Sequence, residues 1–227
     1  MAVRQIKNGK AAGPDNILAE ALKSDIEATT NMLHLLFKKI WEEEQVPMDW
    51  KEGHLVKIPK KGGLSKCENY RRITLLSVPG KVFNRVLLNR MKDAADARLR
   101  DQEAGFRKDR SFTDQIATLR IIVEQSTEWN WSLYVNFIDY EKAFDNVDRR
   151  PLWERRRHYR VPEKIVDIIR NLCDGLQCEV VHGGQLTDAF QLGTGVKQGC
   201  LLSPFLFLLV VHDDRQARPP CRGISNG

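Results

Sequence analysis

The residues best suited to catalysis lie between Phe137 and Asp145, in a segment that reads Phe-Ile-Asp-Tyr-Glu-Lys-Ala-Phe-Asp. Asp139 directly follows the strand-forming run from Leu133 to Ile138. Mg²⁺ takes one or two protein carboxylates and fills its other positions with water and phosphate oxygens. An apolar strand that ends at Asp139 could present such a carboxylate to a metal ion that activates an attacking hydroxyl. The alternative is that Asp139 caps a following helix.

A second candidate is the loop from Gly195 to Pro204, which reads Gly-Val-Lys-Gln-Gly-Cys-Leu-Leu-Ser-Pro. Its glycines allow the backbone to approach a flat ligand closely. Gln198 can contact a base or a sugar through its amide group. The same pattern is also typical of an ordinary loop between a strand and a helix.

Positive charge gathers on a predicted hairpin whose strands are His54–Ile58 and Tyr70–Leu76. Its cations are Lys57, Lys60, Lys61, Lys66, Arg71 and Arg72. Such a group could hold a triphosphate or the backbone of a nucleic acid. Lysines also protect an exposed edge hairpin against aggregation, so the charge alone leaves both interpretations open. The net charge of +6 and the pI near 9.1 permit a polyanionic partner without requiring one.

Composition excludes several classes of protein. The 227 residues are enough for one domain or two subdomains, and a hydrophobic fraction of 42% can form a core. The five cysteines are scattered and form no CxxC pair, and the five histidines are dispersed, which disfavours a disulfide framework or a zinc site. The longest apolar run, Phe205–Val211, is too short to span a membrane. No signal peptide begins the chain, so we expect an intracellular protein in the cytoplasm or the nucleus.

The pattern of apolar residues predicts a mixture of helices and hairpins. Helical spacing runs from Leu18 to Trp41, between Pro14 and Pro47. Further helices are expected at Val82–Met91, Asp114–Glu124, Leu152–His158, Glu163–Cys173 and Phe205–Val211. Gly183-Gly184 predicts a turn between the strands Gln177–His182 and Gln185–Leu192. The expected fold class is therefore α+β.

Taken together and in this order, these segments resemble the reverse transcriptase domain of non-long-terminal-repeat retrotransposons. The resemblance runs from about Asn8 to about Val211. Besides the two segments already described, it rests on Gly-Lys-Ala-Ala-Gly-Pro-Asp at 9–15, Val-Lys-Ile-Pro-Lys-Lys-Gly at 56–62, Asn-Tyr-Arg-Arg-Ile-Thr-Leu-Leu-Ser at 69–77, and Ala-Gly-Phe-Arg-Lys-Asp-Arg-Ser at 104–111. Each block is weakly specific, whereas their correct order is strongly specific.

The resemblance implies a right-hand polymerase with fingers and an incomplete palm. Residues 1–130 would form mainly the fingers, with the N-terminal helix and the basic hairpin. Residues 131–211 would form palm segments with intervening helices and a hairpin. Residues 212–227 would be a disordered tail that does not belong to the family.

The resemblance also implies roles for individual residues. Asp139 would be a catalytic Mg²⁺ ligand, and Asp145 matches a second acidic catalytic position. Phe144 matches the aromatic residue that excludes a 2′-hydroxyl by steric clash and so selects deoxynucleotides.

Further residues would bind the nucleotide or the nucleic acid. Lys60 and Arg71 would clamp the triphosphate, and Gln198 with Gly199 would position the nucleotide and the template. Contacts to the nucleic-acid backbone would come from Lys57, Lys61, Arg72, Arg107 and Arg110. Arg72 stands where the family pattern has proline. The implied partners are an RNA template, a DNA primer and deoxynucleoside triphosphates, without a membrane.

One family motif is not matched. The third palm motif is an aromatic-Ala-Asp-Asp turn between two strands, whereas this chain offers Val-His-Asp-Asp at 211–214, close behind Gln198. Pro219-Pro220 follows and cannot form a returning central strand. We therefore expect an incomplete metal site and negligible polymerase activity from this chain alone. A non-catalytic nucleic-acid-binding remnant and a decayed product without function remain the alternatives.

Overall fold

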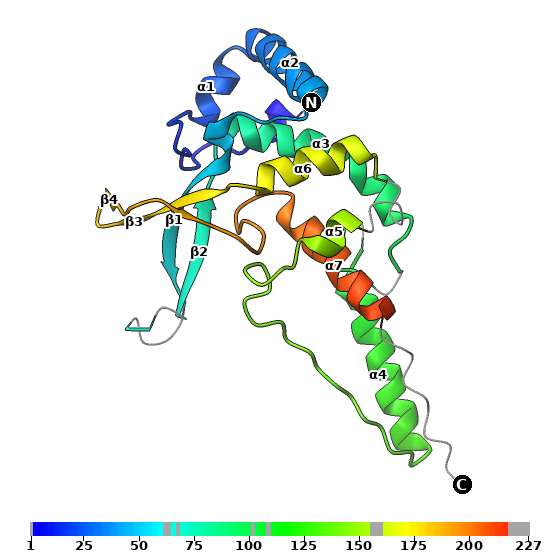
Figure 1. The fold of residues 1–227 in the computed structure, drawn as a ribbon. Coiled ribbons are helices and arrows are strands. Elements are labelled where there is room, and N and C mark those ends of the chain that lie inside the picture. The colour runs from blue at the N-terminus through cyan, green and yellow to red at the C-terminus, as the bar shows by residue number, and fades with distance from the viewer. Residues whose placement is uncertain are drawn as a thin grey trace.

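The computed structural model describes residues 2–60, 65–66, 69–100, 103–107, 110–154 and 161–217 (Figure 1). Its α-helices are α1 (Ala19–Ser24), α2 (Ile26–Glu43), α3 (Val78–Asp96), α4 (Phe112–Glu128), α5 (Arg150–Glu154), α6 (Glu163–Cys173) and α7 (Ser203–Ala217). Its strands are β1 (Glu52–Pro59), β2 (Tyr70–Leu75), β3 (Gln177–His182), β4 (Gln185–Leu186) and β5 (Phe190–Gln191). Short 3₁₀ turns cover Val3–Gln5 and Met48–Lys51. The predicted α+β class is confirmed.

The single helix expected from Leu18 to Trp41 is two helices. Asp25 leaves the helical conformation, with φ −134° and ψ 98°, and its side chain accepts a hydrogen bond from the backbone N–H of Ala28. A short acidic side chain satisfies an exposed N–H at a helix start, so it favours an N-cap over an interior position. The prediction of one continuous helix was therefore wrong at this residue.

The predicted hairpin of β1 and β2 and the predicted turn at Gly183-Gly184 are confirmed, and their strands join in one five-stranded sheet. The strand predicted at Gln185–Leu192 is divided into β4 and β5, which pair separately with β3. The strands β1 and β2 pair antiparallel, with Lys57 opposite Arg72 and Ile58 opposite Arg71. On its other edge, β1 pairs in parallel with β3, although more than 100 residues separate them in the sequence. The strand order is β2-β1-β3-β4, so that one edge of β2 pairs with no other strand of this sheet. The strand β5 pairs with β3.

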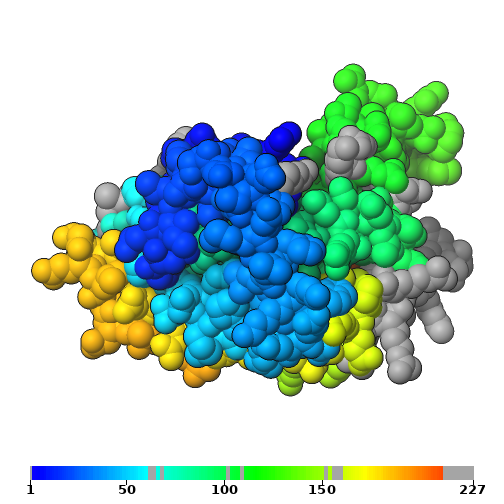
Figure 2. Space-filling view, turned by 90° about the horizontal axis from the view of Figure 1, so that it is seen from above, coloured from blue at the N-terminus to red at the C-terminus, as the bar shows by residue number. Residues whose placement is uncertain are grey.

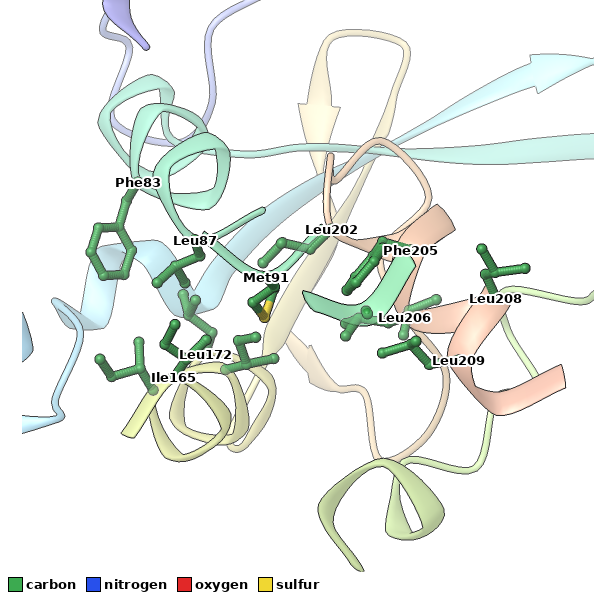
Figure 3. Close-up of a cluster of buried hydrophobic side chains, with 14 of the residues drawn as sticks. Phe83, Leu87, Met91, Ile165, Leu172, Leu202, Phe205, Leu206, Leu208 and Leu209 are labelled. Carbon is green, nitrogen blue, oxygen red and sulfur yellow. The ribbon is translucent and has the colours of Figure 1, made fainter. Parts of the chain in front are cut away.

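The main hydrophobic core lies between helices (Figure 3). It contains Phe83, Leu87 and Met91 from α3, Ile165 and Leu172 from α6, and Leu202, Phe205, Leu206, Leu208 and Leu209 from α7 and the residue before it. Ser77 starts α3 by accepting a hydrogen bond from the backbone N–H of Gly80. This core combines residues from both regions that the sequence assigned to fingers and palm, so the two regions are packed as one unit.

The helix α4 and the segment after it project away from this core (Figures 1 and 2). None of the residues of α4 is buried. Residues 131–140 have no assigned secondary structure, and Tyr134 and Phe137 are 89% and 86% exposed. The predicted strand at Leu133–Ile138 is therefore not formed. Strand-forming residues need a neighbouring strand for their backbone groups, and none lies beside them in the described structure.

The C-terminal helix is longer than predicted. The backbone of α7 continues to Ala217, whereas we expected a disordered tail from residue 212. An established helix gains one hydrogen bond with each added residue, and the polar residues after Val211 are compatible with that extension. Within the described residues, no helix combines the length and the apolarity needed to cross a bilayer.

Candidate active site

The centre of the candidate site is a tight turn at residues 141–146. Lys142 adopts the left-handed conformation with φ 50°. Its carbonyl oxygen accepts hydrogen bonds from the backbone N–H groups of Asp145 and Asn146, at 2.9 and 3.1 Å. Asp145 and the adjacent Phe144 are thus carried by a hydrogen-bonded turn.

The Gln198 loop, residues 193–202, holds this turn against the sheet. The backbone N–H of Val196 donates to the carbonyl oxygen of Phe144 at 2.7 Å. Two residues later, the carbonyl oxygen of Gln198 accepts a hydrogen bond of 2.7 Å from the backbone N–H of Thr74, on the open edge of β2. The loop therefore connects the turn at 141–146 with the basic hairpin, two features that the sequence predicted separately.

Two glycines allow these close approaches. A Cβ atom on Gly199 would lie 2.6 Å from the carbonyl oxygen of Thr74, and one on Gly195 would lie 2.5 Å from that of Asp145. Both glycines have positive φ angles, +114° and +77°. A side chain at either position would push the Gln198 loop away from its neighbour.

Phe144 is half-buried between two other aromatic rings. Its ring centroid lies 6.4 Å from that of Phe106 and 5.5 Å from that of Phe207 on α7. Aromatic rings at such separations attract each other beyond the effect of burial. The position of Phe144 is thus set by packing as well as by the turn.

Asp145 forms an ion pair with Arg72 of β2. The Nη2–Oδ2 distance is 2.5 Å, and the side chains of Asp145 and Arg72 are 39% and 51% exposed. Lys57 stands directly opposite Arg72 on β1, and like charges in such a pair repel each other. The carboxylate of Asp145 offsets this repulsion. It is therefore engaged with the hairpin in this structure.

The two arginines of the hairpin point to opposite faces of the sheet, because neighbouring strand residues alternate. Arg72 faces the turn at 141–146, and Arg71 is exposed on the other face. At the hairpin tip, the backbone N–H of Lys60 donates to the carbonyl oxygen of Asn69 at 2.7 Å. Lys61 lies outside the described residues. The structure therefore brings Arg72, rather than Lys60 and Arg71, to Asp145.

Asp139 lies in the exposed segment before the turn, outside the hydrogen-bonded part of the site. The neighbouring Tyr140 packs edge-on against Phe207, with a centroid distance of 6.0 Å. Across the described ranges, no three His, Cys, Asp or Glu side chains gather into a group that could hold a metal ion. Asp139 therefore belongs to no such group among the described residues, and the Mg²⁺ site expected to be incomplete stays a prediction.

Arg107 is bonded inside the protein rather than exposed to a ligand. Its side chain is 3% exposed, and its Nε atom lies 2.6 Å from Oδ1 of Asp96. The guanidinium also donates to the carbonyl oxygens of Arg100 and Glu103. The hydrogen bond from Arg107 is the main cause that lowers the pKa of Asp96. This geometry favours a structural role over the predicted contact with a template, whereas Arg110 is exposed.

Two partly buried cations, Lys197 of the Gln198 loop and the neighbouring Arg149, were not singled out from the sequence. Lys197 donates from Nζ to the carbonyl oxygen of Trp50 at 3.3 Å, and burial lowers the pKa of its amine. Arg149 donates to the carbonyl oxygen of Cys173 at 2.7 Å and also to that of Gly193. The position of Lys197 between Val196 and Gln198 is the one local signal that could have suggested its contact with Trp50.

The order of these segments agrees with a known family. The profile of the family described as reverse transcriptase (RNA-dependent DNA polymerase) matches residues 58–216, which is more than half of the chain. The chain belongs to the reverse transcriptase family. The match begins near the end of β1 and includes β2, the turn at 141–146 and the Gln198 loop. It extends beyond residue 212, where we expected a tail foreign to the family.

Relatives of this reverse transcriptase chain come from mobile elements. It is 25% identical over 211 residues to the transposon TX1 uncharacterized 149 kDa protein of Xenopus laevis, covering 93% of this chain and 16% of the relative. It is 28% identical to the probable RNA-directed DNA polymerase from transposon X-element of Drosophila melanogaster, covering 93% and 23%. It is 26% identical to the Pol polyprotein from the retrotransposable element R2DM of the same species, covering 91% and 19%.

These matches confirm the resemblance to reverse transcriptases of non-long-terminal-repeat retrotransposons. The reverse transcriptase chain spans less than a quarter of the length of each of these three relatives. Among solved structures, apo telomerase from Candida tropicalis matches with a TM-score of 0.47 and 16% identity, covering 83% of this chain and 45% of the other. That likeness is too partial to support an argument about the site.

Proposed function

We propose that this chain forms the fingers and part of the palm of a retrotransposon RNA-directed DNA polymerase. The observation that supports it most is the placement of the Gln198 loop, which the family match includes, between β2 and the turn at 141–146. In the proposed reaction, the 3′-hydroxyl of a primer attacks the α-phosphate of a deoxynucleoside triphosphate paired with an RNA template. Pyrophosphate is released. We place this reaction inside the cell.

The residues of this chain would bind and orient the nucleotide. Lys60 and Arg71 would contact the triphosphate, and Gln198 would position the nucleotide and the template. The ring of Phe144, held between Phe106 and Phe207, would leave no room for a 2′-hydroxyl. Since Arg72 is paired with Asp145, a phosphate group that binds Arg72 must compete with this carboxylate.

Reverse transcriptases generally use a divalent metal ion, and we propose Asp139 as one ligand of Mg²⁺ in the assembled polymerase. The described residues do not gather a complete set of ligands around it. We therefore assign no chemical step to the metal here. Phosphoryl transfer depends mainly on positioning and on charges such as those of metal ions. We accordingly expect negligible polymerisation by the 227-residue chain alone.

A primer-extension assay on poly(rA)/oligo(dT) with Mg²⁺ tests this expectation. The chain should incorporate no more deoxynucleotide than its Asp139→Ala variant. Robust incorporation that Asp139→Ala abolishes would overturn the proposed inactivity and would support a complete catalytic site.

The basic hairpin favours a second candidate, a module that binds nucleic acid without catalysis. Binding to an RNA/DNA hybrid should then weaken with salt and survive Asp139→Ala. Replacing both Arg71 and Arg72 by alanine should reduce the slope of log K against log[salt] by about 2, since each lost phosphate contact removes about 1. The matched control replaces Lys38 and Lys39, two exposed cations of α2. Equal loss in both double variants would contradict a specific role of the hairpin.

A further inference from the structure

A pocket lies between α2, α3 and the N-terminal 3₁₀ turn at Val3–Gln5. Its volume is about 380 Å³, measured for the centre of a water-sized sphere. Pockets that bind small organic molecules have volumes of about 300–1,000 Å³, so this space can hold a molecule of one or two fused rings. None of the residues of the candidate active site lines it, so the pocket is a separate feature of the chain.

The floor of this pocket is apolar and is fixed by the packing behind it. Val82 and Leu87 of α3 are each 1% exposed, and Leu33 of α2 is 8% exposed. The ring of Phe37 lies 4.9 Å from the ring of Phe83, measured between centroids. Phe83 and Leu87 also belong to the main core (Figure 3). Because aromatic rings attract one another beyond the effect of burial, this floor favours a ligand with an aromatic ring.

The rim of the pocket carries positive charge. His34, Lys38 and Arg90 line it, and no Asp or Glu does so in the part of the chain that the structure describes. The Nζ atom of Lys38 lies 3.9 Å from Oε1 of Glu42, so this cation has a partner. The guanidinium of Arg90 pairs with no described carboxylate, and its Cζ atom lies 5.0 Å from the ring centroid of Trp41, another lining residue. This cation–π contact holds the guanidinium at the wall, where it can meet an anionic group.

We propose that this pocket binds a small aromatic carboxylate, a molecule with a flat apolar ring system and one carboxylate group. The ring lies on the apolar floor, and the carboxylate accepts hydrogen bonds from Arg90, whose planar guanidinium presents parallel N–H groups. An apolar ring fits better than a nucleobase, because the hydroxyl of Thr30 in the lining already donates to the carbonyl oxygen of Ile26 at 2.6 Å. This site goes beyond the proposed polymerase function and does not depend on it.

The ligand should bind the folded chain and not the unfolded one. Val3, Leu33 and Val82 all line the pocket, although they are far apart in the sequence. They come together only when α2, α3 and the N-terminal turn are packed. A ligand that binds only the folded state stabilises it by mass action, so the melting temperature should rise with the ligand concentration.

Isothermal titration calorimetry with 2-naphthoate and 2-naphthamide, at low salt and without nucleotide or nucleic acid, tests the proposal. The two probes have the same rings, and only the first is charged. The wild-type chain should bind 2-naphthoate about fivefold more tightly, as expected for one ion pair at a partly exposed site. Arg90→Gln should reduce this preference to less than about twofold. Arg98→Gln, which removes the same charge from an exposed residue outside the pocket, should leave the preference unchanged.

A second variant tests the apolar floor. Val86 is half-buried and lines the pocket, so Val86→Trp should fill it and weaken the binding of both probes by about tenfold or more. The matched control is Val123→Trp on α4, an exposed position outside the pocket, which should bind both probes as the wild-type chain does.

Four results would overturn the proposal. They are the absence of binding by 2-naphthoate, equal binding of the two probes by the wild-type chain, an unchanged preference in Arg90→Gln, and unchanged affinities in Val86→Trp. If Val86→Trp does not fold, Arg90→Gln still decides, because it replaces an exposed side chain. Because no polymerase substrate is present, failure here leaves the proposed polymerase function untouched.

Discussion

Gly195 lies where the Gln198 loop crosses the backbone of Phe144 and Asp145. A Cβ atom at this position would lie 2.5 Å from the carbonyl oxygen of Asp145 and 2.7 Å from that of Phe144. The φ angle of +77° adds a second penalty, because side chains other than glycine rarely adopt it. Gly195→Ala should therefore disturb both the stability of the chain and the turn at 141–146.

The expected loss follows from two separate contributions. The left-handed conformation costs an alanine roughly 1–2 kcal/mol. Moving a backbone that is too close costs a further 1–3 kcal/mol, roughly, by analogy with overpacked cores. The total is about 3 kcal/mol, which lowers the melting temperature of a domain of this size by about 10 °C.

Two other glycines of the same chain separate the contributions. Gly184 has a φ of +80°, and no atom lies within 4 Å of the position that a Cβ would take, so Gly184→Ala should cost only the conformational part, about 1 kcal/mol. Gly193 has open space and no left-handed φ, so Gly193→Ala should be neutral or stabilising by about 0.5 kcal/mol.

Urea denaturation of the three variants measures these differences, and hydrogen exchange at residues 141–147 reports on the turn. Gly195→Ala should be the least stable variant and should speed exchange in the turn. Equal stability of Gly195→Ala and Gly184→Ala would refute the close approach of the two backbones.

Three further predictions concern stability. Lys197→Met should stabilise the chain at pH 7, because burial lowers the pKa of the Lys197 amine in the folded chain. The stability difference between the variant and the wild-type chain should shrink as the pH rises toward 10.5, the ordinary pKa of lysine, since the unfolded chain binds more protons than the folded chain below that value. Melting curves between pH 7 and 10.5 measure this difference, and a difference that stays constant would contradict the prediction. A double-mutant cycle of Arg72→Ala and Asp145→Asn should give a coupling of about 0.2–1 kcal/mol, as expected for an exposed pair, that disappears in high salt. Ile168→Ala should cost about 2–5 kcal/mol in urea denaturation, since Ile168 is 0% exposed, and a loss below about 1 kcal/mol would exclude its burial in the core.

Most helices and both hairpins were predictable because their signals are local. The spacing of apolar residues on α3 and α6 indicates a buried face, and Gly183-Gly184 supplies the positive φ angles of 58° and 80° that a two-residue turn needs. The strand predicted at Leu133–Ile138 shows the limit of such signals. Its residues favour a strand, but a strand also requires a partner, and sequence propensity does not reveal whether one is adjacent.

The candidate site was predictable only as a set of separate motifs. The order of the blocks identified the family, and it pointed to Phe144, Asp145, Gln198 and Gly199, which lie in the turn and the loop that the structure brings together. The sequence did not distinguish Arg72 from Arg71 as the partner of Asp145, because that choice depends on the register of β1 and β2. It also assigned Arg107 to the template, whereas its guanidinium is enclosed by backbone carbonyl groups of its own loop.

By itself, the sequence determined most of the local elements and the family, because these depend on residue types and on short spacings. The residues expected to act on a nucleotide stay predictions. Only the tertiary structure decided that β1 pairs with β3, that the Gln198 loop joins β2 to the turn at 141–146, and that α2 and α3 form a pocket beside Arg90. These contacts connect residues far apart in the chain. They depend on how helices and strands pack, and no short stretch of sequence contains that information.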